Sequence, residues 1–132
     1  MINFKQNHIL KLAIQEAEKS NYKQKLGAVI FDKKIIISSG HNTHSSKRKK
    51  LHPQFQKWNG SIHAEVDAII RARKELKGCS LLVVRLNNKS EIRLAKPCKE
   101  CMKYILYVGI KKIYYSSNKF PFIEKINMKN IW

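Results

Sequence analysis

Two patterns of apolar positions divide the chain into candidate helices and strands. In three segments, apolar residues recur every three or four positions, which is the period of one helix face. Elsewhere, short apolar runs are bounded by turn residues, which is typical of strands. The predicted helices span about 6–19, 63–77 and 98–108, and the predicted strands span 26–31, 35–39, 80–86, 112–116 and 122–126. Residues 91–94 are expected to form a short extended piece, and 80–86 has the strongest strand pattern, so we expect it at the centre of a sheet.

The connections between these segments constrain how the strands pair. Asp32-Lys33-Lys34 is a tight turn between the first two strands, which predicts a hairpin. Only residues 117–121 separate the last two strands. A helical crossover between parallel strands needs about a dozen residues. We therefore expect the last two strands to be antiparallel.

Length and composition indicate a globular protein. The 132 residues, 43% of them hydrophobic, suffice for a sizeable core, so we expect a single domain over 1–132. No apolar run is long enough to span a bilayer, and the N-terminus lacks the apolar core of a signal peptide. Two of the three cysteines form a metal-type pair. This usage suggests a reducing compartment, so the expected location is cytoplasmic.

The formal net charge of +18 has two interpretations. A chain this basic favours a polyanionic partner such as nucleic acid. However, lysines outnumber arginines 22 to 5, and isoleucine and asparagine are abundant. That usage is typical of an AT-rich genome, which raises lysine content without any selection for binding. Charge alone therefore leaves the partner open.

Two short motifs carry the candidate chemistry. The first is His-Ala-Glu at 63–65, and the second is Pro-Cys-Lys-Glu-Cys at 97–101. A catalytic zinc site needs three protein ligands and one open position for water. His63, Cys98 and Cys101 supply one imidazole and two sulfurs that lie one helical turn apart. The proline suits the start of a helix, whose dipole favours thiolates in its first turn.

A structural zinc site is the main alternative, and it needs a fourth protein ligand. The remaining candidates are Cys79, His8, His41, His44 and His52. None has a tight spacing to the cysteine pair, and Cys79 is most simply a buried thiol. A lone Cys-x-x-Cys is also common in redox pairs. The two motifs together, each followed by a helical pattern, favour a catalytic site.

With these motifs the chain resembles the cytidine deaminase superfamily, whose signature is H-x-E followed by P-C-x-x-C. The resemblance covers the chain from the first helix through Tyr115. It implies an α/β fold, a three-layer α/β/α sandwich with a mixed sheet of about five strands. It also implies a Zn²⁺ cofactor on His63, Cys98 and Cys101, and a catalytic Glu65 that moves protons from water to the ring nitrogen and the leaving amine. An antiparallel last pair of strands departs from the deoxycytidylate, tRNA-adenosine and polynucleotide deaminases, which keep these strands parallel.

The resemblance also bears on the substrate. Glu100 stands where the tRNA-adenosine deaminases usually carry a methionine, which favours cytosine over adenosine. Both motif regions look most similar to deoxycytidylate-type and small viral or phage members. Asn42 matches an asparagine that contacts the substrate sugar in the family, although asparagine is also a common turn residue. We also expect Ala64 to contact the substrate.

The polar connection 43–60 is a candidate nucleic-acid site. Its basic and aromatic residues are Lys47, Arg48, Lys49, Lys50, Phe55 and Trp58. In single-stranded sites, charges follow the phosphates and rings stack on the bases, so we expect all six to bind nucleic acid or substrate. The alternative is a solvated loop whose aromatic residues pack onto the domain.

We favour zinc-dependent hydrolytic deamination of cytosine to uracil in single-stranded DNA or RNA. The alternative substrate is a free (deoxy)cytidine nucleotide such as dCMP, whose one 5′-phosphate the cations would bind. A third hypothesis is a catalytically silent, zinc-stabilised nucleic-acid-binding module. Glu65 argues against it, because a binding module has no use for that carboxylate. No membrane partner is expected, and the oligomeric state is left open.

Overall fold

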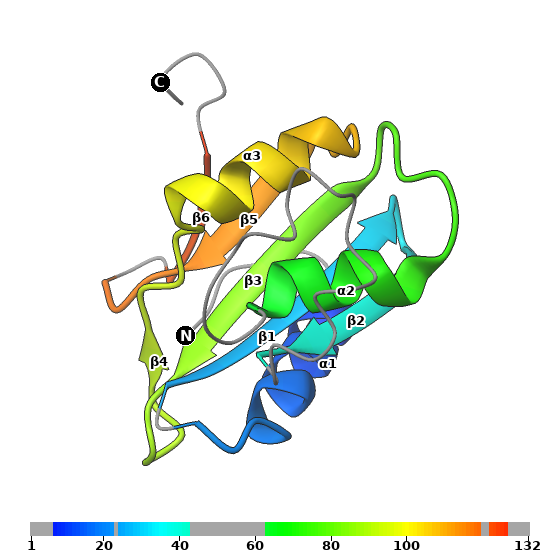
Figure 1. Ribbon diagram of the computed structural model, residues 1–132. Coiled ribbons are helices and arrows are strands. Elements are labelled where there is room, and N and C mark those ends of the chain that lie inside the picture. The colour runs from blue at the N-terminus through cyan, green and yellow to red at the C-terminus, as the bar shows by residue number, and fades with distance from the viewer. Residues whose placement is uncertain (1–6, 23, 43–62, 120–121, 127–132) are drawn as a thin grey trace.

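The computed structural model describes residues 7–22, 24–42, 63–119 and 122–126 (Figure 1). A mixed, six-stranded sheet forms the middle layer. Its strands are β1 (Lys25–Asp32), β2 (Ile35–His41), β3 (Ser80–Leu86), β4 (Ile92–Arg93), β5 (Lys112–Ser116) and β6 (Ile123–Lys125). The order across the sheet is β2-β1-β3-β5-β6, and β4 pairs with β3. The expected mixed sheet is confirmed, and the extended piece at 91–94 adds a two-residue strand to it.

Strand pairing follows the predictions made from the connections. β3 is central, as predicted, because it is antiparallel to β1 on one side and parallel to β5 on the other. β1 and β2 form the expected hairpin, with Lys33 at a φ of 58° in the turn. β5 and β6 are antiparallel, which confirms the expectation from the short connection between them.

Helices cover both faces of the sheet because the side chains of β1 and β3 alternate between two apolar cores. The core under α1 (Asn7–Glu18) contains Val29, Phe31, Leu82, Val84 and Leu86. The core under α2 (Ala64–Ala72) and α3 (Lys99–Tyr107) contains Ala28, Ile30, Leu81, Val83 and Ile113. The three-layer α/β/α arrangement is therefore confirmed (Figure 1).

The second helix is shorter than its apolar pattern predicted. The prediction ran to residue 77, but α2 ends at Ala72, because Arg73 takes a left-handed conformation with φ 51°. Leu76 is buried all the same, since it joins the α2 and α3 core from the connecting segment. None of the helices in the described part of the chain combines the length and apolarity needed to cross a bilayer.

Two glycines let the helices lie directly on the sheet. A Cβ atom at Gly27 would lie 2.0 Å from the carbonyl oxygen of Ala13 in α1. A Cβ atom at Gly40 would lie 2.5 Å from the backbone nitrogen of Ala68 in α2. Any larger residue would push the helix away, so Gly40 fixes the height of α2 above β2.

The direction of α2 and α3 decides where the site lies. Each helix leads through a short connection into the strand after it, β3 or β5, and these two strands are parallel. The N-terminal ends of both helices therefore lie at the carboxyl ends of β3 and β5 (Figure 1). In α/β sheets this is the edge where ligands bind.

Candidate metal centre and active site

The candidate zinc ligands lie at the starts of α2 and α3. His63 is the N-cap of α2 and has an extended backbone (φ −72°, ψ 159°). Cys98 is the N-cap of α3, and its sulfur accepts a hydrogen bond from the backbone N–H of Cys101 at 3.4 Å. The expectation of two cysteines in one turn is met, with the proline just outside the helix. Helix capping thus fixes both sulfurs locally.

The two helix starts bring His63, Cys98 and Cys101 together. The Nδ1 atom of His63 lies 3.0 Å from the Cys101 sulfur and 3.7 Å from the Cys98 sulfur. The three ligand atoms all lie within 4.8 Å of one another. A tetrahedral zinc with bonds of about 2.0–2.3 Å places its ligand atoms about 3.5–3.8 Å apart. The geometry and the Cys₂His donor set therefore fit a zinc ion with an open fourth position.

A structural zinc site needs a fourth protein ligand, and none of the described candidates belongs to the cluster. His8 contacts the carbonyl oxygen of Lys34, and His41 contacts a carboxylate of α1. Cys79 is buried just before β3, and its carbonyl accepts a hydrogen bond from the N–H of Lys111, just before β5. This end of the two strands is opposite the end at which α2 and α3 begin. His44 and His52 lie outside the described residues. Among the described residues, the metal-type cluster thus consists of three residues.

The two cysteines differ strongly in acidity. A hydrogen bond from Cys101 and a further contact with His63 lower the pKa of Cys98 to about 4. Burial raises the pKa of the Cys101 thiol, because that sulfur lies away from water. The hydrogen bond with Cys98 raises the pKa of His63, since a thiolate favours the imidazolium. Thiolates and a neutral imidazole are the forms that bind a metal, so a divalent metal that binds here displaces the protons these groups carry.

Glu65 lies in the first turn of α2, two residues after the candidate ligand His63. Its side chain is 3% exposed, and its Oε1 atom has no hydrogen-bond partner among the described residues. Burial raises the pKa of this carboxyl group. A buried carboxylate with a free oxygen and a high affinity for protons is suited to general acid–base work.

Comparison with known families bears directly on this arrangement. Residues 4–117 match the family described as the cytidine and deoxycytidylate deaminase zinc-binding region. The chain belongs to this deaminase family. The expected resemblance is therefore confirmed, and a family defined by a zinc-binding region agrees with the three-residue cluster.

Known proteins similar to this deaminase-family chain include one from Aliivibrio fischeri, an uncharacterized deaminase in the luxG 3′ region. It is 28% identical over 103 residues, which cover 76% of this chain and 63% of that protein. Human deoxycytidylate deaminase is 36% identical over 59 residues, which cover 44% of this chain and 28% of the human protein. The chain thus matches less than two thirds of the length of either relative.

Solved structures of a phage enzyme show the same fold. The dCMP deaminase of cyanophage S-TIM5, in its apo form, superposes with a TM-score of 0.62 and 21% identity, over 88% of this chain and 85% of that one. The same enzyme in complex with dCMP and dUMP gives a TM-score of 0.62 and 24% identity, over 84% and 79% of the two chains.

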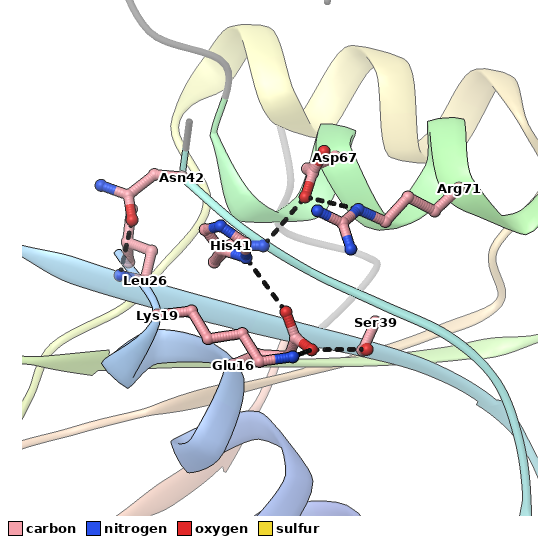
Figure 2. Close-up of polar contacts among 8 residues, drawn as sticks. All are labelled: Glu16, Lys19, Leu26, Ser39, His41, Asn42, Asp67 and Arg71. Atoms are coloured by element: carbon pink, nitrogen blue, oxygen red, sulfur yellow. Dashed lines mark hydrogen bonds and ion pairs between the residues drawn. The ribbon is translucent and has the colours of Figure 1, made fainter. Parts of the chain in front are cut away.

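Asn42, the expected sugar contact, is buried at the end of β2. Its Oδ1 atom accepts from the Leu26 N–H at 3.0 Å (Figure 2). Its Nδ2 atom donates to the Gln24 carbonyl at 2.9 Å. An asparagine amide has two N–H groups and two lone pairs, so one of each is left for a ligand. Ala64 is fully buried as the first residue of α2. Sugar and substrate binding by these two residues stay predictions.

The residues expected to contact nucleic acid or bases fall in the connection between β2 and α2. Lys47, Arg48, Lys49, Lys50, Phe55 and Trp58 lie outside the described residues. Their expected roles stay predictions.

A polar network that sequence reasoning missed holds β2 between α1 and α2 (Figure 2). The Asp67 carboxylate accepts from the backbone N–H of His41 and pairs with Arg71, both at 3.1 Å. On the other side, Glu16 contacts His41 Nδ1 at 3.1 Å. Asp67 lies one helical turn after His63, so this network fixes the turn of α2 that carries the metal ligand. The i, i+4 spacing of Asp67 and Arg71 was its one local signal.

The α1 end of this network predicts a pH-dependent contribution to stability. Burial would raise the pKa of Glu16, but hydrogen bonds from Lys19, His41 and Ser39 outweigh it and lower the pKa below 4.5. The ionised carboxylate therefore stabilises the fold above about pH 4.5, and this contribution is lost as the pH falls through the lowered pKa. We expect Glu16→Gln to lower the melting temperature at pH 7 by about 3–8 °C.

Thermal unfolding of both proteins from pH 7 to pH 3 measures this effect. The gap between wild type and Glu16→Gln should narrow below about pH 4.5. Glu18→Gln, on the exposed side of the same helix, is the matched control and should leave the melting temperature unchanged. A gap that stays constant over the whole pH range would contradict the ionised role of Glu16.

Proposed function

We propose that this protein hydrolyses cytosine to uracil in a free (deoxy)cytidine nucleotide such as dCMP. The reaction consumes one water molecule and releases one ammonia. The observation that carries the proposal is the cluster of His63, Cys98 and Cys101 beside the buried carboxyl group of Glu65, whose Oε1 atom has no hydrogen-bond partner among the described residues. Hydrolytic deamination of a nucleobase uses this combination of a metal site and a proton-transfer group.

Each residue of the cluster has a role set by its chemistry. His63, Cys98 and Cys101 hold the zinc, which when bound supplies a Lewis acid that lowers the pKa of a water molecule. Glu65 takes one proton from the attacking water and delivers it to the ring nitrogen. It then takes the second proton, from the hydroxyl group added to the ring, and delivers it to the amine, which leaves as ammonia. Its raised pKa suits this role, because a group that must accept and return a proton works best when its pKa approaches the working pH.

Comparison with known proteins moves our preference from polynucleotide to free nucleotide. The similarity to human deoxycytidylate deaminase, and the fold shared with a phage dCMP deaminase solved with dCMP and dUMP, support a nucleotide substrate. The sequence had favoured single-stranded nucleic acid because of its +18 charge. That charge still supports a polynucleotide as the second candidate. The catalytically silent module is disfavoured, since a buried carboxyl oxygen without a hydrogen-bond partner is costly unless it is used.

A substrate panel tests the proposal. The protein is incubated with dCMP, CMP, deoxycytidine, cytidine, and single- and double-stranded oligonucleotides, and the uracil formed in each is measured. We expect turnover of a free nucleotide with a shallow salt dependence, since one phosphate is bound, and little uracil in the oligonucleotides. Uracil formed in single-stranded oligonucleotides alone, with a steep loss of activity as salt rises, would instead establish the second candidate.

A further inference from the structure

Two arginines lie directly opposite each other at the carboxyl end of β3. Arg85 of β3 pairs with Arg93 of β4. Leu81 and Val83 of β3 point into the core under α2 and α3, and alternation along the strand places Arg85 on the same face. Directly paired residues share a face, so Arg93 lies there too. Both guanidinium groups therefore belong to the side of the sheet that carries the candidate active site.

The two guanidinium groups have few acceptors among the described residues. The Nε atom of Arg85 is buried and has no hydrogen-bond partner among the described residues. Its Nη1 atom donates to the Leu94 carbonyl at a distance of 3.4 Å. Arg93 donates to the Ile92 carbonyl at 3.1 Å and pairs with Glu91 at 3.2 Å. The Glu91 oxygen that pairs with Arg93 also accepts from the amide of the Asn87 side chain, so Arg93 shares this acceptor with a neutral donor.

This arrangement is unfavourable by itself. Like charges directly opposite each other destabilise an antiparallel pair. A buried guanidinium N–H group without an acceptor adds a desolvation cost. Such groups in a folded protein call for an explanation, and an anionic ligand supplies both the missing acceptor and the missing negative charge.

The position of the pair connects it to the candidate active site. Leu94, which the Arg85 side chain contacts, lies four residues before Cys98. On the other side, Arg85 pairs with Leu26 of β1, whose backbone N–H binds the side chain of Asn42. The arginine pair thus lies between the strand that holds Asn42 and the segment that leads to Cys98. Figure 1 shows β4 and the end of β3 on the side where α2 and α3 begin.

We propose that Arg85 and Arg93 bind the 5′-phosphate of the nucleotide substrate. The proposal rests on the proposed function, because it assigns the phosphate of that substrate to a place beside the deaminase site. A guanidinium group presents a planar fork of N–H donors that matches phosphate oxygens, and Arg85 and Arg93 exceed the one negative charge of Glu91. Arg85 and Arg93 therefore select nucleotides over nucleosides.

Removal of one guanidinium separates this role from a purely structural one. We expect Arg85→Gln to lower kcat/KM for dCMP by about 10- to 100-fold, the range for a hydrogen bond to a charged group. The value for deoxycytidine, which has no phosphate, should stay within about twofold. Arg73→Gln is the matched control, since it removes the same charge at the opposite end of α2 and should change neither value. Arg93→Gln tests the site again if Arg85→Gln fails to fold.

Inorganic phosphate provides a second readout that does not depend on turnover. Phosphate should raise the melting temperature of wild type and Arg73→Gln but not of Arg85→Gln. Equal losses on dCMP and deoxycytidine, or equal stabilisation of wild type and Arg85→Gln by phosphate, would overturn the proposal. If wild type turns over no dCMP, the proposed function fails. The phosphate titration then decides the arginine site alone, since stabilisation that Arg85→Gln abolishes supports it and unchanged stabilisation refutes it.

Discussion

Replacement of Glu65 by glutamine is expected to reduce deamination by about 10²- to 10⁴-fold, the usual contribution of a general acid–base group. The amide has the same shape as the buried carboxyl group, but it cannot accept and return a proton. The loss should appear in kcat, because the residue acts in proton transfer rather than in holding the nucleotide. Steady-state kinetics on the best substrate of the panel measure it.

Further measurements separate the loss of a proton-transfer group from the loss of metal or of structure. Zinc content and melting temperature should match those of wild type, since Glu65 is not one of the three clustered ligands. Glu18→Gln provides a control, because it makes the same chemical change to an exposed glutamate of α1 outside the site and should keep kcat. Near-normal turnover by Glu65→Gln would show that another group moves the protons.

The parts of the structure that could be predicted from sequence are those that local patterns decide. Alternation in β3 between two apolar faces made it the central strand, and the short connection after β5 required an antiparallel partner. The ligand cluster could be predicted because Cys98 and Cys101 lie in one turn and His63 begins another helix. The strand pairing and each of the two motifs depend on residues that are close in sequence, whereas the resemblance to a known family is what joined the two motifs into one site.

The features that sequence reasoning missed depend on tertiary contacts. α2 ends at Ala72, although apolar spacing continues to Leu76, because burial of that residue does not require a helix. The contact between Glu16 and His41 joins residues 25 positions apart and has no local signal. Arg85 and Arg93 were assigned to two extended segments, but only the register of β3 and β4 shows that they face each other.

The net charge of the chain does not by itself distinguish a long polyanion from a single small anion. A value of +18 suggests a long polyanion, and it moved the sequence interpretation toward nucleic acid. At the described end of β3, however, Arg85 and Arg93 lie directly opposite each other, and Glu91 pairs with Arg93. One small anion, the phosphate of a nucleotide, is therefore the partner that we propose for this part of the surface.

Replacement of Cys101 by alanine is expected to abolish stoichiometric zinc binding. Cys101 is the fully buried member of the cluster, and its sulfur lies 3.0 Å from the ring nitrogen of His63. Even changes to residues that only support a ligand cost about 10- to 100-fold in metal affinity, so loss of a ligand itself should cost more than ~100-fold. Deamination should fall below detection, and elemental analysis of the purified protein should find well under one zinc per chain.

Cys79→Ala is the control that separates metal binding from the loss of a buried thiol. Cys79 is also buried, but it lies at the opposite end of the helices from the cluster, so this variant should keep one zinc per chain and its activity. A chelator should lower the melting temperature of wild type and Cys79→Ala, because removal of a ligand bound only by the folded state destabilises it. It should leave Cys101→Ala unchanged, since no zinc is there to remove. One zinc per chain in Cys101→Ala, or an equal response of all three proteins to the chelator, would mean that the metal is held elsewhere.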